Sequence, residues 1–152
     1  MKRHQSQPPL RPRRVLFLCT GNSCRSQMAE GWARHLFGDG LEVFSAGLEK
    51  HGVNPFAVQV MQEAGVDISG QRSQRIDELP ETEFDLVITL CGHAAENCPF
   101  LPGAHKTIHR GFDDPPRLAA ASAPDQALDC YRLVRDQIRA FITDELPLLL
   151  EQ

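Results

Sequence analysis

The stretch that decides the fold is residues 15–26, Val-Leu-Phe-Leu-Cys-Thr-Gly-Asn-Ser-Cys-Arg-Ser. Its apolar beginning predicts a short buried strand over 15–19. Gly21 and Asn22 come next, and both residue types tolerate the left-handed backbone that a tight loop requires. From Ser26 onward, apolar residues recur at helical spacing to Phe37. The pattern therefore predicts a strand, a tight loop and a helix in direct succession.

This loop has the residue types of a site for a tetrahedral oxyanion. Backbone N–H groups of such a loop point inward and bind an anion, and the positive end of the following helix faces the same point. The guanidinium of Arg25 suits phosphate-like oxygens. The same groups stabilise a thiolate at Cys19, to which Ser26 can donate its hydroxyl, and this makes Cys19 a nucleophile. We expect the oxyanion to be held by Thr20, Gly21, Asn22, Ser23, Cys24, Arg25 and Ser26.

Two other interpretations of this stretch are weaker. A nucleotide-binding phosphate loop would need a lysine after its last glycine, and the loop has none. A cysteine that only packs at a strand end, beside a surface arginine, would not require serine directly after that arginine. The spacing therefore favours a catalytic loop.

Length and composition are those of one soluble domain. The 152 residues are 41% apolar and 24% charged, and no apolar run approaches a membrane span. Residues 1–14 carry five basic side chains, no acidic one and three prolines, which predicts a disordered basic arm before a single catalytic domain over 15–152. Without these five charges the net charge falls from −4 to −9, which argues against nucleic acid as a partner.

Cysteine usage indicates a reducing compartment. The five cysteines are an odd number, and the arm lacks the apolar middle of a secretion signal. A structural disulfide framework is therefore not expected. We expect a cytoplasmic protein in which the thiols are core residues, metal ligands or redox catalysts.

The order of predicted elements indicates the fold class. We expect strands over 15–19, 41–45, 84–90 and 106–109, helices over 26–37, 54–64 and 125–146, a short helix over 75–79 and a loop over 111–125. Pro147 should end the last helix. This alternation is typical of an α/β domain with a four-stranded parallel sheet and helices on both faces. Ligands of such folds lie beyond the carboxyl ends of the strands, where Cys19, Cys91 and the 111–115 loop would meet.

Cys91 and Cys98 form the second chemical feature. Seven residues are about two helical turns, which would hold the two Cα atoms roughly 10 Å apart, beyond the reach of a disulfide. Gly92 and Pro99 make local unwinding easier. We therefore predict a redox switch that is helical when reduced and looped when oxidised. Two packed core cysteines are the simpler alternative, and a zinc site with His93 is another, although its ligand spacing is unusual.

The third feature is Gly-Phe-Asp-Asp-Pro-Pro over 111–116. A carboxylic acid here can protonate a departing oxygen, although an Asp-Pro turn alone is common. We choose Asp114 over Asp113 as the acid because the following prolines restrain it. The four histidines at 51, 93, 105 and 109 show no metal spacing and are expected to be surface or packing residues.

Together, three segments resemble one known family. Residues 18–31, Thr-Leu-Cys at 89–91 followed by Cys98, and His-x-Gly-Phe-Asp-Asp-Pro over 109–115 resemble the thioredoxin-coupled arsenate reductases, which share the fold of low-molecular-weight protein tyrosine phosphatases. The likeness covers about residues 13–150. It implies a protein that binds arsenate, with phosphate or sulfate as competing oxyanions, and takes electrons from thioredoxin, with glutaredoxin as the alternative. No bound cofactor or metal is implied, and we expect a monomer.

The resemblance also implies a sequence of steps. Cys19 attacks arsenate held by the loop and Arg25, and Asp114 protonates the leaving hydroxyl. Cys91 then attacks Cys19, arsenite leaves, and a Cys19–Cys91 disulfide remains. Cys98 next attacks Cys91, which leaves a Cys91–Cys98 disulfide for thioredoxin to reduce.

Two positions depart from the family pattern. Position 110 is Arg where an aromatic residue is expected. Some relatives bind potassium beside the loop, and Asn22, Glu30 and Ser45 match their ligands, but position 74 is Gln rather than an acid. The alternative function is a phosphatase for phosphotyrosine or a small phosphoester, which would need no second thiol pair. A non-enzymatic oxyanion or redox sensor is a third possibility.

Overall fold

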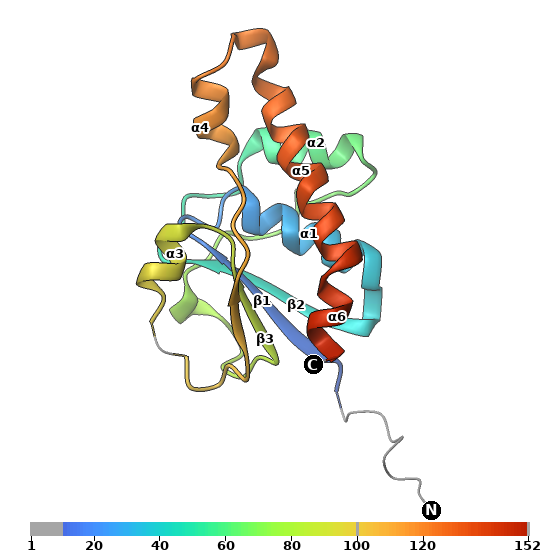
Figure 1. Ribbon diagram of the computed structural model, residues 1–152, viewed down its shortest axis with the longest axis vertical. Helices are drawn as coiled ribbons and strands as arrows, with labels where there is room; N and C mark the ends of the chain where they lie inside the picture. Colours follow the sequence, from blue (N-terminus) through green and yellow to red (C-terminus); the bar gives the residue numbers. More distant parts are fainter. Residues whose placement is uncertain (1–10, 100, 152) are drawn as a thin grey trace, which may run out of the picture.

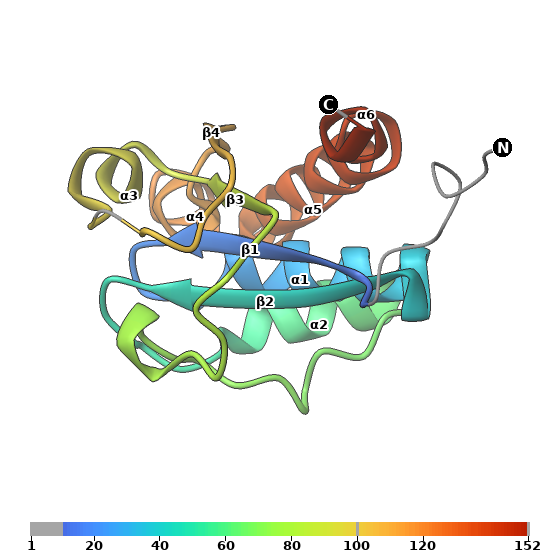
Figure 2. The same ribbon diagram turned by 90° about the horizontal axis from the view of Figure 1, so that it is seen from below.

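The fold is built on four parallel strands. The computed structural model describes residues 11–99 and 101–151. The strands are β1 (Arg13–Cys19), β2 (Leu41–Gly47), β3 (Leu86–Thr89) and β4 (Thr107–His109) (Figure 1). They lie in the order β2-β1-β3-β4, which is seen in Figure 2. All three strand pairs are parallel. The arrowheads of β1 and β2 point to the end at which α3 lies (Figure 2). β2 lies on one side of β1, and β3, the next strand along the chain, lies on the other side. The strand order therefore reverses between β1 and β3, and ligands of such sheets bind where these two strands end.

The long helices pack on one face of this sheet. They are α1 (Arg25–Phe37), α2 (Pro55–Glu63) and α5 (Ala127–Asp144), followed by α6 (Leu146–Glu151). Alternate residues of β1, such as Val15 and Phe17, face these helices, as expected from the two-residue period of a strand. A strand whose alternate faces are both buried reads as a continuous apolar run, which explains the pattern seen in the sequence.

The opposite face has a thinner cover. Leu16 and Leu18 pack there against Ile76 of the 3-10 helix η3 (Ile76–Glu78) and against Cys98, Leu101 and Ala104. The predicted four-stranded parallel sheet with helices on both faces is confirmed, although the helix in this second cluster is only the short η3.

The helix boundaries follow from ordinary capping. Asn54 Oδ1 accepts hydrogen bonds from the N–H groups of Phe56 at 2.8 Å and Ala57 at 3.3 Å, and Pro55 takes the first helical position of α2. Just beyond the end of α2, Gly65 has a φ of 86°, a conformation that favours glycine. The predicted start and end of this helix are therefore confirmed.

Two predictions near the C-terminus are wrong. The segment 111–125 is not all loop, because α4 (Pro115–Ala120) forms within it and the 3-10 helix η4 (Pro124–Gln126) begins at its end. Prolines occupy the first turn of each helix, where their missing N–H is not needed. Pro147 does not end a helix but lies in the first turn of α6, while α5 already ends at Asp144. Together, α4 and the beginning of α5 project beyond the sheet (Figure 1).

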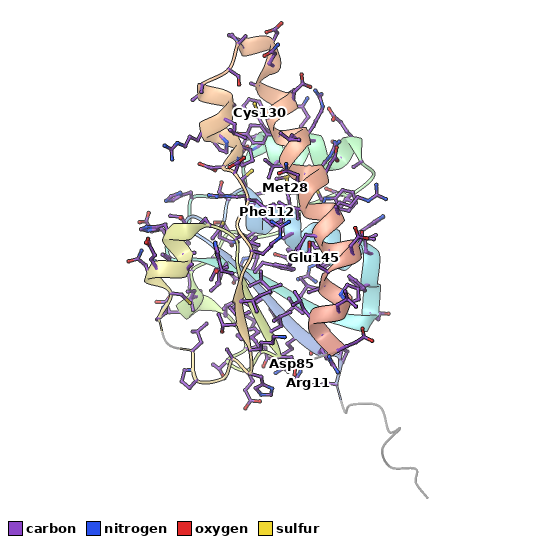
Figure 3. The ribbon with its side chains drawn as sticks, in the orientation of Figure 1. Arg11, Met28, Asp85, Phe112, Cys130 and Glu145 are labelled. Carbon is purple, nitrogen blue, oxygen red and sulfur yellow. The ribbon has the colours of Figure 1, made fainter. Side chains whose placement is uncertain are left out.

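The boundary of the N-terminal arm also needs correction. Arg13 and Arg14 belong to β1 rather than to a disordered arm, because Arg14 is held by acidic neighbours. Its N–H donates to Asp85 at 2.7 Å, and its guanidinium pairs with Glu42 at 3.2 Å and with Glu81 at 3.0 Å. Arg11 reaches Asp85 at 3.2 Å (Figure 3).

Residues 1–10 of the predicted arm lie outside the described residues. Among the residues that the structure does describe, no helix has the length and apolar character needed to cross a membrane.

Candidate active site

The loop after β1 turns its carbonyl groups away from the pocket. The N–H groups of residues 49, 51 and 54 donate to the carbonyl oxygens of Thr20, Gly21 and Ser23, each at 2.9 Å. The carbonyl oxygen of Asn22 accepts from Gln27 Nε2 at 3.1 Å. In a trans peptide the N–H points opposite to the C=O, so the loop amides face inward. The loop is therefore prepared for an anion by hydrogen bonds on its outer side.

Asn22 supports the loop from within. It is fully buried and has a φ of 48°, in the left-handed region that asparagine tolerates. Its Nδ2 donates to Ser26 Oγ at 2.9 Å and to Ser45 Oγ at 3.0 Å, while its Oδ1 accepts from Gln74 N at 2.8 Å. One side chain thus ties the loop to the helix that follows it and to β2.

The same network orients a donor toward Cys19. Ser26 Oγ lies 2.9 Å from Cys19 Sγ, and both side chains are buried. Because Ser26 Oγ accepts from Asn22, its own hydrogen is free to point at the sulfur. A hydroxyl hydrogen bond to sulfur favours the thiolate. This arrangement suits a nucleophile at the end of β1.

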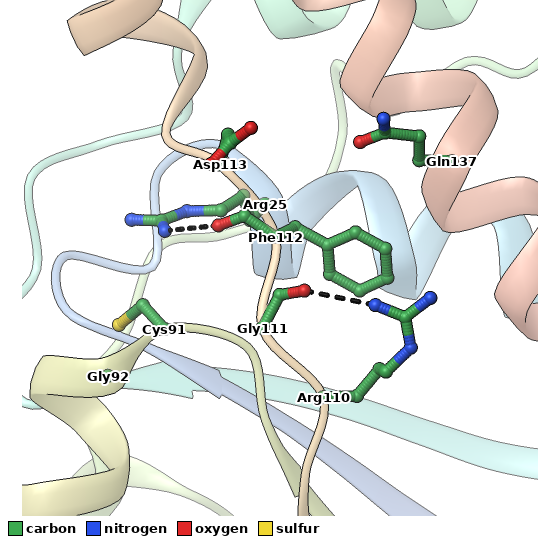
Figure 4. A pocket seen from close by; sticks show the side chains of 8 residues that line it. All are labelled: Arg25, Cys91, Gly92, Arg110, Gly111, Phe112, Asp113 and Gln137. Carbon is green, nitrogen blue, oxygen red and sulfur yellow. Dashed lines mark hydrogen bonds between the residues drawn. The ribbon is translucent and has the colours of Figure 1, made fainter.

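Arg25 and Asp114 close the other side of the pocket. Arg25 Nη1 donates to the carbonyl oxygen of Phe112 at 3.0 Å, and Arg25 Nη2 lies 3.5 Å from Asp114 Oδ1 (Figure 4 shows the contact with Phe112). A pocket of about 370 Å³ contains Cys19, Arg25 and Asp114 together. Asp113 instead lines a neighbouring pocket. The geometry therefore favours Asp114 as the acid, as the sequence predicts.

Cys91 lies within reach of the loop. It follows β3 and is buried, and its Sγ is 3.3 Å from Thr20 Oγ1 and accepts from Ala94 N at 3.4 Å. Since β1 and β3 are adjacent and parallel, the residues that follow them meet at one edge of the sheet. The thiol of Cys91 therefore lies beside Thr20, the residue that follows Cys19.

Cys98 stands at the far end of α3 (Gly92–Asn97), which Cys91 precedes. The thiol of Cys98 is partly buried, and burial raises its pKa. Both cysteines are free and α3 lies between them, so the predicted helix is present, while its unwinding on oxidation stays a prediction. Within 11–99 and 101–151, no three His, Cys, Asp or Glu side chains form a metal-binding group, so the zinc alternative with His93 finds no support.

Cys24 is part of the pocket wall. It is buried within the loop, and burial, with the nearby Cys19 as a second cause, raises the pKa of its thiol. Cys24 is therefore a neutral packing residue beside the nucleophile. The remaining cysteine, Cys130, lies on α5 with its Sγ 3.4 Å from Ser122 Oγ. It is only partly buried, so it is not the core residue that its place on an apolar helix would suggest.

His51 is a site residue that sequence reasoning missed. Its imidazole lines the pocket that contains Cys19, instead of being a surface or packing residue only. It arrives there because the turn after β2 bonds to the loop carbonyls. No periodicity or motif spacing in the chain marks it.

The unusual Arg110 lines the neighbouring pocket with Cys91 (Figure 4). Its guanidinium lies 4.7 Å from the ring centre of Phe112 and 5.4 Å from that of Phe141, and it pairs with Glu145 at 3.8 Å. A cation stacked on aromatic rings thus stands where relatives are expected to have an aromatic residue.

The residues that would hold potassium bond to one another instead. Ser45 Oγ donates to Glu30, Arg34 pairs with Glu30 at 2.8 Å, and Gln74 Nε2 donates to the carbonyl oxygen of Ser45 at 3.1 Å. Burial raises the pKa of Glu30. The side-chain N–H groups of Asn22 and Gln74 point into this cluster, where a cation requires oxygen atoms. The set does not fit a potassium ion.

Comparison with known proteins agrees with this geometry. Residues 14–142 match the family model of the low molecular weight phosphotyrosine protein phosphatases. The arsenate reductase of Halalkalibacterium halodurans is 52% identical over 124 residues, which cover 82% of this chain and 88% of that protein.

Solved structures give the same result. An arsenate reductase in its phosphate-binding state superposes with a TM-score of 0.70 at 35% identity, covering 91% of this chain and 97% of that chain. A thioredoxin-dependent arsenate reductase of Corynebacterium glutamicum gives a TM-score of 0.67 at 26% identity, covering 93% of this chain and 63% of that chain. The chain therefore belongs to the low molecular weight phosphotyrosine protein phosphatase family, on the branch formed by the arsenate reductases.

Proposed function

We propose that this protein reduces arsenate to arsenite through Cys19, Cys91 and Cys98. The disulfide that results is reduced by thioredoxin. The observation that carries the proposal is the position of Cys91, a buried thiol whose Sγ contacts the residue next to Cys19. Curated relatives that are 52% identical in sequence are arsenate reductases, which supports the same activity for this protein.

The first step joins sulfur to arsenic. The loop amides and Arg25 hold the oxyanion, and the Cys19 thiolate attacks the arsenic atom. The S–As bond forms while one As–OH bond breaks. The departing hydroxyl takes a proton from Asp114 and leaves as water. Arsenic is still pentavalent after this step, which so far is the chemistry of a phosphatase.

The second step is the reduction. Cys91 attacks the sulfur of Cys19, so an S–S bond forms and the S–As bond breaks. The electron pair of that bond stays with arsenic, which leaves as trivalent arsenite. The two sulfurs have supplied the two electrons and are now a Cys19–Cys91 disulfide.

The third step moves the disulfide outward. Cys98 attacks Cys91, which releases Cys19 as a thiolate and leaves a Cys91–Cys98 disulfide. In a regular helix the two Cα atoms would be about 10 Å apart, so α3 must unwind for this bond to form. A dithiol reductant then attacks the exposed disulfide. Thioredoxin is chosen because a thioredoxin-dependent arsenate reductase is among the structural relatives.

The alternative of a phosphatase uses the same Cys19, Arg25 and Asp114. In that reaction water would hydrolyse the covalent adduct on Cys19. Cys91 would then have no role. The contact between Cys91 and Thr20 favours the reductase.

Arsenate-dependent oxidation of NADPH, coupled through thioredoxin and thioredoxin reductase, tests the proposal. We expect turnover by the wild-type protein and none by Cys19→Ser, Cys91→Ser or Cys98→Ser. Cys130→Ser is the matched control, since Cys130 lies on α5 outside both pockets, and it should keep full activity. Turnover by Cys91→Ser would contradict the relay, and hydrolysis of a phosphoester in place of arsenate reduction would favour the phosphatase.

A further inference from the structure

The imidazole of His51 lies at the edge of the oxyanion pocket. The backbone N–H of His51 donates to the carbonyl oxygen of Gly21, so the main chain of this residue is bound to the loop. Its ring covers Gly21 so closely that a Cβ atom added there would be 2.2 Å from His51 Nδ1. The side chain is 54% exposed and shares the pocket with Cys19 and Asp114. His51 therefore touches both the loop and the space that the oxyanion enters.

Glu49 determines which nitrogen of this ring carries the proton. Glu49 Oε1 lies 2.8 Å from His51 Nε2, and a carboxylate only accepts hydrogen bonds. The proton is therefore on Nε2, and the neutral ring has its lone pair on Nδ1, the nitrogen over Gly21. Lys50, between them in the sequence, is bound to Glu78 at 2.7 Å and does not line the pocket. The other charged groups of the pocket are Arg25 and Asp114.

We propose that His51 selects oxyanions that carry a hydroxyl group, by accepting a hydrogen bond from that hydroxyl at Nδ1. Arsenate and phosphate are dianions with one remaining proton in mildly alkaline solution, whereas sulfate has none. A lone pair facing a bare sulfate oxygen is repulsive, while the same lone pair facing As–OH or P–OH is satisfied. This inference rests on the proposed oxyanion site at Cys19 and defines its substrate class.

The donors of the pocket cannot make this distinction. Loop amides and Arg25 only donate, and they bind any tetrahedral dianion of similar size in the same way. Discrimination therefore requires an acceptor, and outside the loop the groups of the pocket with acceptor atoms are His51 and Asp114. Asp114 pairs with Arg25 at 3.5 Å and supplies the proton of the first step, so we assign the accepting role to His51. Phosphate resembles arsenate in shape and protonation, so His51 would weaken the binding of sulfate relative to both.

The same contact would orient the substrate for the first step. Because His51 and Asp114 line the same pocket, the hydroxyl bound to His51 would be the group that accepts a proton from Asp114 and leaves as water. His51 neither donates nor accepts a proton in this step. It acts as a specificity residue that touches the substrate, while Glu49 acts through it and is a positioning residue.

Titration calorimetry of the reduced protein with sodium phosphate and with sodium sulfate tests the inference in mildly alkaline buffer. The measured quantity is the ratio of the sulfate Kd to the phosphate Kd, because a change of charge near the pocket affects two dianions alike and cancels in the ratio. We expect His51→Ala to lower this ratio about five- to tenfold, the worth of one hydrogen bond.

Two further variants complete the test. In Glu49→Gln the side-chain amide can donate to Nε2, which allows a proton on Nδ1, so the ratio should fall as well. Glu78→Gln removes a negative charge of the same neighbourhood that does not line the pocket, and the ratio should stay within about twofold of the wild-type ratio.

The outcomes separate this inference from the proposed function. If His51→Ala binds phosphate and its ratio equals the wild-type ratio, the role of His51 is overturned while the oxyanion site stands. If the wild-type protein binds neither anion, the site and the inference both fall. Arsenate turnover, measured separately, decides the reductase activity whatever the ratio.

Discussion

Removing the hydroxyl of Ser26 tests the account of the nucleophile. In Ser26→Ala the sulfur of Cys19 loses a buried donor at 2.9 Å, and the Nδ2 group of Asn22 loses one of its two acceptors. A hydrogen bond to a charged group is worth about 1.5–3 kcal/mol. At about 1.4 kcal/mol for each factor of ten, the equilibrium between thiol and thiolate at Cys19 should shift toward the thiol about 10- to 150-fold.

Alkylation of Cys19 by iodoacetamide measures this fraction, because only the thiolate reacts. At neutral pH we expect Ser26→Ala to react more slowly, by up to the factor given above. At strongly alkaline pH, where the thiol is ionised in both proteins, the two rates should converge. Convergence shows that the change affects ionisation and not access to the pocket.

A matched control uses the other hydroxyl that bonds to this loop. Ser73 Oγ donates to the carbonyl oxygen of Gly21 at 3.2 Å and does not contact the sulfur. Ser73→Ala should therefore react with iodoacetamide within about threefold of the wild-type rate. A Ser26→Ala protein that is alkylated at the wild-type rate at neutral pH would refute the reasoning, as would an equal slowing by Ser73→Ala.

Three other experiments give clear expectations. Asp114→Asn should lower kcat for arsenate about 10²- to 10⁴-fold in the coupled assay while phosphate still binds, and Asp113→Asn should change kcat little. Cys24 should stay unlabelled when the native protein is treated with iodoacetamide at neutral pH, because burial raises the pKa of its thiol; peptide mass spectrometry would show a label there if this is wrong. Phe17→Ala, at a fully buried position in β1, should cost about 3–5 kcal/mol of unfolding free energy, and a melting temperature within a few degrees of the wild-type value would contradict the packing described.

The strand-loop-helix unit at residues 15–26 was predictable because its signals are local. An apolar run, Gly21 and Asn22, and the helical spacing after Ser26 all act within a dozen residues. The meeting of Cys91 with this loop was also predictable, since parallel neighbouring strands end at one edge of the sheet. The structure agrees with both, and the contact of Thr20 with Cys91 is the result.

The features that escaped prediction depend on the folded chain. The short helix α4 is stable because it packs against α5, whereas its prolines and the two aspartates before it read as a loop in the sequence. His51 enters the pocket only because residues 49–54 bond to the carbonyl groups of the loop. Arg110 stands in place of an expected aromatic residue because two phenylalanine rings, one of them on α5, accept its guanidinium.

The most direct test of the central claim is a single turnover of Cys98→Ser with arsenate and no external reductant. We expect one arsenite to be released per protein molecule. We also expect a Cys19–Cys91 disulfide, identified by mass spectrometry after the protein is digested without reduction. Arsenite formed without this linkage, or no arsenite although Cys19 is intact and reactive, would contradict the relay.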